Sequence, residues 1–149
     1  MAISGIGGDT ASGILKRLPP IVEAQPEKLF LMVGVNDLIY GNQQDLIQNY
    51  EKILAQLTTK LPDTQIFIQS ILPINSQVRQ IRIENETILE VNQQIKALAD
   101  KFGLVYADLN ALMADDQQQL KAEFTRDGIH INGEAYLIWK AAIESWVKG

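Results

Sequence analysis

Apolar residues along this chain follow two alternating spacings, which predict strands and helices in turn. Three short, mostly apolar runs are typical of parallel strands covered on both faces, namely Leu29–Val33, Gln65–Ile71 and Leu104–Ala107. Apolar residues at helical spacing predict three longer elements, which run from Asp45 to Leu61, from Glu84 to Phe102 and from Gly133 to Val147. The alternation predicts a three-layer α/β fold around a parallel sheet.

Polar residues and prolines predict where these elements begin and end. Asp9 or Thr10 is expected to cap a first helix, which Pro19-Pro20 ends after Leu18 because proline lacks the N–H donor. The expected connections are an exposed loop over Asn75–Gln80 and an irregular or helical segment over Asp108–Leu120. The last helix is expected to turn four side chains inward, namely Tyr136, Trp139, Ile143 and Trp146.

Composition indicates one globular domain and excludes several partners. The chain has 149 residues, of which 46% are hydrophobic and 21% are charged, values typical of a single packed core. Its formal charge of -5 would repel nucleic acid. No apolar run approaches the roughly 18 residues of a membrane span, and the first nine residues show no leader pattern. As written, the chain is expected to be cytoplasmic, with no nucleic-acid partner and no membrane span.

Three short polar stretches interrupt the regular pattern and hold the candidate chemistry. They are Gly5–Thr10, Gly34–Asp37 and Asp127–His130. The second follows the carboxyl end of a predicted strand, where open α/β sheets place their sites. The chain has no cysteine and one histidine, so any imidazole chemistry must use His130.

Each stretch admits two interpretations when taken alone. The glycines ahead of Thr10 fit a tight turn or, less well, a phosphate-binding loop. Asn36 and Asp37 fit either a turn or a site in which the Asn36 amide donates to a developing oxyanion. Asp127 is either a helix cap beside an incidental histidine, or the residue that orients the His130 ring as a base.

Together, the three stretches resemble a known family. Gly-Ile-Gly-Gly-Asp-Thr, Gly-Val-Asn-Asp and Asp-Gly-Ile-His, in this order, are similar to the second, third and fifth sequence blocks of the SGNH/GDSL hydrolases. The likeness is greatest to the platelet-activating-factor acetylhydrolase-like branch, where the first block opens a helix ending in Arg-Leu, as Arg17-Leu18 does here. The resemblance covers essentially the whole chain.

The resemblance implies a role for each matching residue. The Gly8 backbone N–H and the Asn36 side chain would donate to the oxyanion, and His130 would be the general base oriented by Asp127. Asp9 and Asp37 would support the site without touching substrate. The implied fold is a flavodoxin-like sheet of five parallel strands with helices on both sides. The implied activity is hydrolysis of a small-molecule ester, without a metal or any other cofactor.

One family block has no counterpart. The family's nucleophile lies in a Gly-Asp-Ser block after its first strand, and none of the five serines here has that context. The resemblance therefore implies that residues 1–149 are a single, N-terminally incomplete domain, lacking the first strand and most of the second. Because the family's strand order is 2-1-3-4-5, Leu29–Val33 is then expected to be an exposed edge, through which a homodimer could form.

Two other functions stay open at this point. A relic of the same fold could bind ligands, or act as an interaction module, without catalysis. A weaker alternative is a metal-dependent phosphoesterase that uses four ligands, namely Asp9, Asp37, Asp127 and His130.

Overall fold

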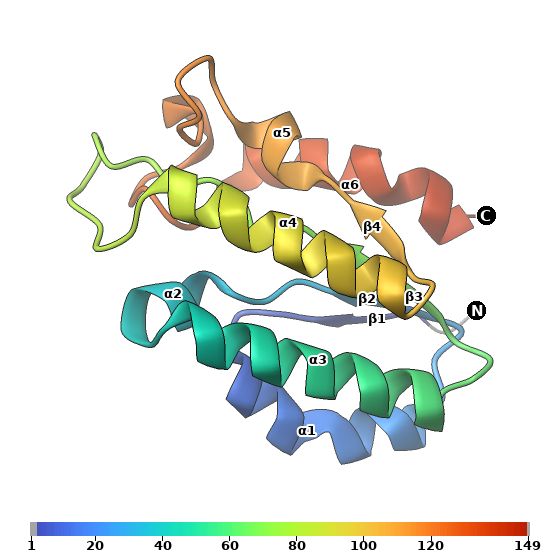
Figure 1. Cartoon of the computed structure of the whole chain (residues 1–149). Helices are drawn as coiled ribbons and strands as arrows, with labels where there is room; N and C mark the ends of the chain where they lie inside the picture. Colours follow the sequence, from blue (N-terminus) through green and yellow to red (C-terminus); the bar gives the residue numbers. More distant parts are fainter. Residues whose placement is uncertain (1–2, 149) are drawn as a thin grey trace.

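The computed structural model describes residues 3–148 and confirms the alternation of strands and helices (Figure 1). The strands are β1 (Ile3–Ile6), β2 (Lys28–Leu31), β3 (Gln65–Gln69) and β4 (Val105–Ala107). The helices are α1 (Ala11–Ala24), α2 (Val35–Tyr40), α3 (Gln43–Lys60), α4 (Asn85–Lys101), α5 (Leu109–Met113) and α6 (Gly133–Lys148), with a 3-10 turn at Ala122–Phe124.

All pairings in the four-stranded sheet are parallel, and the strand order is β1-β2-β3-β4. The prediction that Leu29–Val33 forms an exposed edge is wrong, because β2 lies between β1 and β3. Ser4 pairs with Leu29 and Gly5 with Phe30, so β1 satisfies the backbone groups that an edge would leave unpaired. The dimer predicted through that edge therefore loses its basis.

Two hydrophobic clusters lie on opposite faces of the sheet, as a three-layer fold requires. Leu29 and Leu31 point to the face covered by α1, α3 and α4, where Ile14, Leu54 and Val91 are fully buried. Phe30 alternates to the other face and stacks on Phe67, with ring centroids 4.6 Å apart. There α6 contributes the buried Ile143 and the partly buried Trp139 and Trp146.

The structure corrects two predicted helix boundaries. The first helix does not end at Leu18 but continues through Pro19 and Pro20 to Ala24. Both prolines lie on the solvent side, where water can bond the carbonyls that lose their N–H partners. The helix predicted to start at Asp45 begins at Gln43, and its cap is Asn42, whose side chain accepts from the Asp45 N–H.

Two side chains differ from the prediction in how exposed they are to solvent. Asn75 is buried, although it begins the loop that was expected to be exposed. Its amide donates to the Leu120 carbonyl at 2.7 Å, which satisfies the polar group inside the fold. Tyr136 is half exposed, unlike the other three residues that α6 was expected to turn inward.

Among the described helices, none is both long and apolar enough to cross a bilayer.

Buried asparagine amides fix the chain where it leaves β3. Asn92 accepts from the Ile71 N–H at 2.8 Å and donates to the Ile71 carbonyl at 2.9 Å. Asn85 makes the same pair of bonds with Ile74, at 2.8 and 2.9 Å. These side chains replace the strand partners that the backbone has lost. The segment after β3 therefore has one defined path despite having no regular structure.

Replacing Asn92 by leucine should destabilise the protein by about 1–3 kcal/mol, because it leaves the buried Ile71 N–H without a partner. The Ile71 carbonyl loses one of its two donors and keeps the other, the Asn110 side-chain amide at 3.0 Å. Urea unfolding monitored by circular dichroism measures this change. The matched control is Gln93→Leu, on the exposed side of the same helix turn, which should stay within about 0.5 kcal/mol of wild type. Equal stability of the two variants would contradict the role given to Asn92.

Candidate active site

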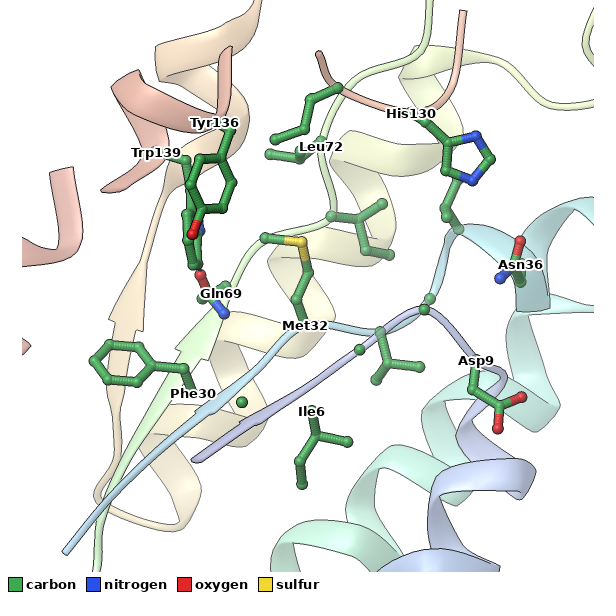
Figure 2. Close-up of a pocket in the computed structure, with 18 of the residues that line it drawn as sticks. Ile6, Asp9, Phe30, Met32, Asn36, Gln69, Leu72, His130, Tyr136 and Trp139 are labelled. Carbon is green, nitrogen blue, oxygen red and sulfur yellow. Dashed lines mark hydrogen bonds between the residues drawn. The ribbon is translucent and has the colours of Figure 1, made fainter. Parts of the chain in front are cut away.

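The three polar stretches meet at one pocket of about 510 Å³. Gly8 follows β1, Asn36 lies in α2 just after β2, and His130 lies in the loop before α6. Figure 2 shows Asn36 and His130 at the same end of the pocket, with the Asn36 amide nitrogen turned toward its interior. The carboxyl ends of parallel strands thus bring together residues that are far apart in the sequence.

The first stretch is a glycine turn that leads directly into a capped helix. Gly8 has a positive φ of 73°, a backbone conformation that glycine adopts without strain. Its N–H makes no hydrogen bond with another described residue and is free to bind a ligand. Thr10 caps α1 by accepting from the Gly13 N–H at 3.2 Å. Of the two predicted caps, Thr10 is therefore the correct one.

Asp9 lines the pocket, but its hydrogen bonds and ion pair are local. Its carboxylate accepts from the Thr10 N–H at 2.7 Å and lies 3.6 Å from the Arg17 guanidinium. A Cβ at Gly13 would lie 2.4 Å from this carboxylate, so only glycine leaves room for it there. The contacts fit a residue that shapes the turn.

Asp37 ties the second stretch to the first. Both of its carboxylate oxygens lie 3.1 Å from the N–H of Ala11, the first residue of α1. A negative charge is favoured at a helix N-terminus. Burial nevertheless raises the pKa of Asp37, although the Ala11 N–H opposes this shift. The Asn36 side chain, by contrast, makes no hydrogen bond with another described residue and faces the pocket.

Gly34 allows the turn that carries Asn36 to lie close to the segment that follows β3. Its φ is 141°, and a Cβ there would lie 2.4 Å from the Ile71 side chain. Both the backbone conformation and the available space therefore require glycine. Ile71 is the residue whose backbone Asn92 holds, so the asparagine bonds also fix the surface on which this turn rests.

Asp127 and His130 form a hydrogen-bonded pair. The Asp127 Oδ2 lies 2.6 Å from the His130 Nδ1, and its Oδ1 accepts from the N–H groups of Ile129 and His130 at 2.9 and 2.8 Å. The bond from the His130 ring, with help from these two N–H groups, lowers the pKa of Asp127 well below its usual range. Asp127 is therefore ionised at neutral pH, and the His130 Nε2 is left to face the pocket.

Further contacts lock this pair into one conformation. Gly128 has a φ of 86°, and a Cβ there would lie 2.6 Å from the Asn75 carbonyl. The Asn75 N–H donates to the Gly128 carbonyl at 2.8 Å, which joins the turn to the segment after β3. The Thr125 hydroxyl donates to the His130 carbonyl at 2.7 Å and accepts from the Gly128 N–H at 2.9 Å. The roles of Asn75 and Thr125 were not predicted, because no local sequence pattern marks either residue as part of the site.

The rest of the pocket is mostly apolar, and its residues were not predicted to belong to the site. Its walls include Phe30 from β2, Met32 just after β2, Leu72 after β3, and Trp139 from α6. The Trp139 indole donates to the Gln69 side chain at 2.6 Å. The pattern of apolar residues along the strands predicts which side chains are buried. It does not predict which of them border a cavity.

The four ligands of the phosphoesterase alternative do not form a set. Among the described residues, no three acidic or histidine side chains gather as a metal ion would need. Asp37 binds the start of α1, and Asp127 binds His130. The carboxylates are thus committed to different local partners, and this alternative is set aside.

Comparison with known proteins identifies the family. A sequence model of the GDSL-like lipase/acylhydrolase family matches residues 2–138. The chain belongs to this family. Its members include lipases and other acylhydrolases, which are esterase-type hydrolases. The resemblance inferred from the three polar stretches is confirmed at this level.

Solved GDSL-like structures share the fold. A GDSL-like lipase from Bacteroides thetaiotaomicron VPI-5482 is 18% identical with a TM-score of 0.85, and the match covers 98% of this chain and 87% of that one. A Streptococcus pneumonia structure named for platelet activating factor is 24% identical with a TM-score of 0.80, covering 97% and 83%. The α/β/α fold predicted from the sequence is confirmed.

One curated relative is named as a different kind of enzyme, and it is much longer than this chain. The N-acylneuraminate cytidylyltransferase of Streptococcus agalactiae serotype III (strain NEM316) is 26% identical over 130 residues. The match covers 87% of this chain but 30% of that protein. The GDSL-like chain therefore spans less than a third of this relative's length.

The raised pKa of Asp37 predicts a pH-dependent stability difference. Because the folded state holds this proton more tightly than the unfolded state, the contribution of Asp37 to stability falls as the pH rises through its folded pKa. Asp37→Asn keeps an acceptor for the Ala11 N–H but does not titrate. Relative to wild type, this variant should gain stability between pH 4 and pH 7, measured by urea unfolding. Asp63→Asn, at an exposed turn, controls for the loss of one charge; an equal gain there would contradict the prediction.

Proposed function

We propose that this chain contributes most of the active site of a serine ester hydrolase. His130 is the general base, Asp127 orients it, and the Gly8 N–H and the Asn36 amide stabilise the oxyanion. One observation carries the proposal: two free donors and an aspartate-bound imidazole line the same pocket. Membership of the GDSL-like family supports the same reaction class. We assign residues 1–149 to a single catalytic domain.

The proposed reaction has two steps, acylation of the serine and hydrolysis of the acyl-enzyme, and both use the same proton transfers through His130. A serine oxygen bonds to the ester carbonyl carbon while the His130 Nε2 takes its proton, and the carbonyl electrons move onto the oxygen held by Gly8 and Asn36. Collapse of this intermediate breaks the bond to the alcohol, which leaves with the proton from His130. Water then attacks the acyl-enzyme by the same route and releases the acid.

The nucleophilic serine in this proposal lies outside residues 3–148. Ser4 borders the pocket, but its partner in the sheet, Leu29, faces α1 and α3, so its side chain points away from His130. Ser70 is buried and accepts from the Asn110 N–H at 2.8 Å. The other three serines do not border the pocket, and they are Ser12, Ser76 and Ser145.

Labelling with a fluorophosphonate tests the serine. The native protein, purified from its own source, should be labelled once and should hydrolyse a short-chain aryl ester. Mass spectrometry of the labelled peptide then locates the nucleophile. A label on any of the five serines of residues 1–149 would refute the assignment made here. Absence of both labelling and hydrolysis would favour the alternative, a ligand-binding domain without catalysis.

Substituting the oxyanion donor and the base should have distinct effects. In the native protein that carries the nucleophile, Asn36→Ala should lower kcat by about 10²–10³-fold with little change in KM, because its bond strengthens only in the transition state. His130→Gln should lower kcat/KM by at least about 10³-fold. Gln48→Ala, on the exposed side of α3, is the control and should keep wild-type rates. A wild-type rate in the Asn36 variant would exclude it from the oxyanion site.

A further inference from the structure

The arginines of this chain gather around the candidate active site. The chain has four, and one of them, Arg17, pairs with Asp9, which lines the pocket. The other three belong to the turn that carries His130 or to the loop beside it, and all are exposed, namely Arg79, Arg82 and Arg126. Within residues 3–148, none of these three forms an ion pair. The fold therefore leaves three guanidinium groups next to the site without a charged partner in the part of the chain that the structure describes.

Arg126 starts directly beside His130. Thr125 and Ile131 form an antiparallel bridge, and Arg126 and His130 are the next residues on the two arms of this hairpin. Side chains of opposite residues leave an antiparallel pair on the same face, and the face alternates along each arm. In agreement, Thr125 is buried, whereas Arg126 and His130 are exposed. The guanidinium of Arg126 can therefore reach a group that is bound next to the imidazole.

The loop of residues 75–83 brings the other two arginines to the same turn. The Ile81 side chain lies against Gly128, where a Cβ would be 3.1 Å from its terminal carbon. Ile81 and Ile83 are both partly buried against the core, so Arg82 between them faces solvent. Figure 1 shows this loop and the segment before α6 at the same end of the molecule. Arg82 is thus the second cation beside the His130 turn.

The balance of charge at this turn differs from that of the whole protein. The chain has a net charge of -5, which by itself repels an anionic ligand. Residues 75–84 nevertheless contain two arginines and one acidic residue, Glu84. The carboxylates of Asp127 and Asp9 each have a partner of their own. The surface beside the site therefore has an excess of positive charge, which favours an anion.

We propose that Arg126, with Arg82 beside it, binds a negatively charged group on the alcohol portion of the ester, which rests on the function proposed above. In that reaction His130 gives its proton to the departing alcohol, so the alcohol portion lies next to the imidazole and within reach of Arg126. A guanidinium has paired N–H donors that match the oxygens of a carboxylate or a phosphate. The substrate class is an ester of a hydroxy acid or of a phosphorylated alcohol.

Two esters of the same shape but different charge test the proposal. 4-Acetoxybenzoate is an anion, 4-acetoxybenzamide is its neutral counterpart, and both release acetate. In the native protein that carries the nucleophile, kcat/KM should be about five- to tenfold higher for the anion, through a lower KM. Equal kcat/KM for the two esters at low salt would overturn the proposal.

Two further measurements define the interaction. Raising the salt concentration to about 1 M should remove most of the preference, because salt screens exposed charges. A preference that persists at this salt concentration would overturn the assignment to arginine. 4-Acetoxyphenyl phosphate distinguishes the two anions, because a higher kcat/KM than that of 4-acetoxybenzoate assigns the site to a phosphate and a lower one assigns it to a carboxylate.

Arg126→Gln tests the residue. It should reduce the ratio of kcat/KM for the charged and neutral esters to less than about twofold, whereas Arg126→Lys keeps the charge without the paired donors and should retain part of the ratio. The matched control is Lys60→Gln, an exposed cation where α3 ends, which should keep the wild-type ratio. A wild-type ratio in folded Arg126→Gln would overturn the proposal. If circular dichroism shows that this variant is unfolded, Arg82→Gln replaces it and should also lower the ratio.

Binding separates this inference from the proposed reaction. Amide NMR spectra of the chain of residues 1–149, which need no nucleophile, should show shifts at Ile129 and His130 with 4-acetoxybenzoate and smaller ones with 4-acetoxybenzamide. Shifts that Arg126→Gln abolishes support the anion site even if no ester is hydrolysed. Hydrolysis with no preference for the charged ester supports the reaction and overturns the anion site.

Discussion

The candidate site depends on a buried carboxylate at the start of a helix. Asp37, from the short helix α2 after β2, accepts the N–H of Ala11, which begins the helix after β1. Each of these connections holds one proposed oxyanion donor, Asn36 or Gly8. Fixing the two donors before substrate arrives is what makes electrostatic stabilisation effective. The raised pKa of Asp37 shows that burial of this carboxylate opposes its ionisation.

A second set of bonds brings the base to the same place from the far end of the chain. Asn92 holds Ile71, Asn85 holds Ile74, and Asn75 holds Gly128. The Asp127–His130 turn therefore rests on a segment that is itself held by amides from α4. The segment after β3 has a defined path although it is irregular, because side chains supply hydrogen-bond partners for its backbone groups. Asparagine side chains therefore hold this part of the site in place where regular secondary structure is absent.

Sequence patterns predicted most of the elements but failed at their limits. Periodicity located three strands, yet it missed the pairing of β1 with β2, because a four-residue strand with glycine gives almost no signal. Pro19-Pro20 indicated a helix end, but the structure carries α1 past both residues. Asn75 belonged to a polar run, yet it is buried because its amide finds the Leu120 carbonyl. The error at Asn75 arose because a distant contact outweighed a local preference.

By itself the sequence determined the α/β alternation, the family, and the residue types that the proposed chemistry needs. Those follow from local spacing, from the single histidine and from three short motifs. Only the tertiary structure decided that Gly8, Asn36 and His130 border one pocket. The reason is physical: the shape of a cavity depends on side chains brought together from separate strands and helices, and also on side chains that are absent.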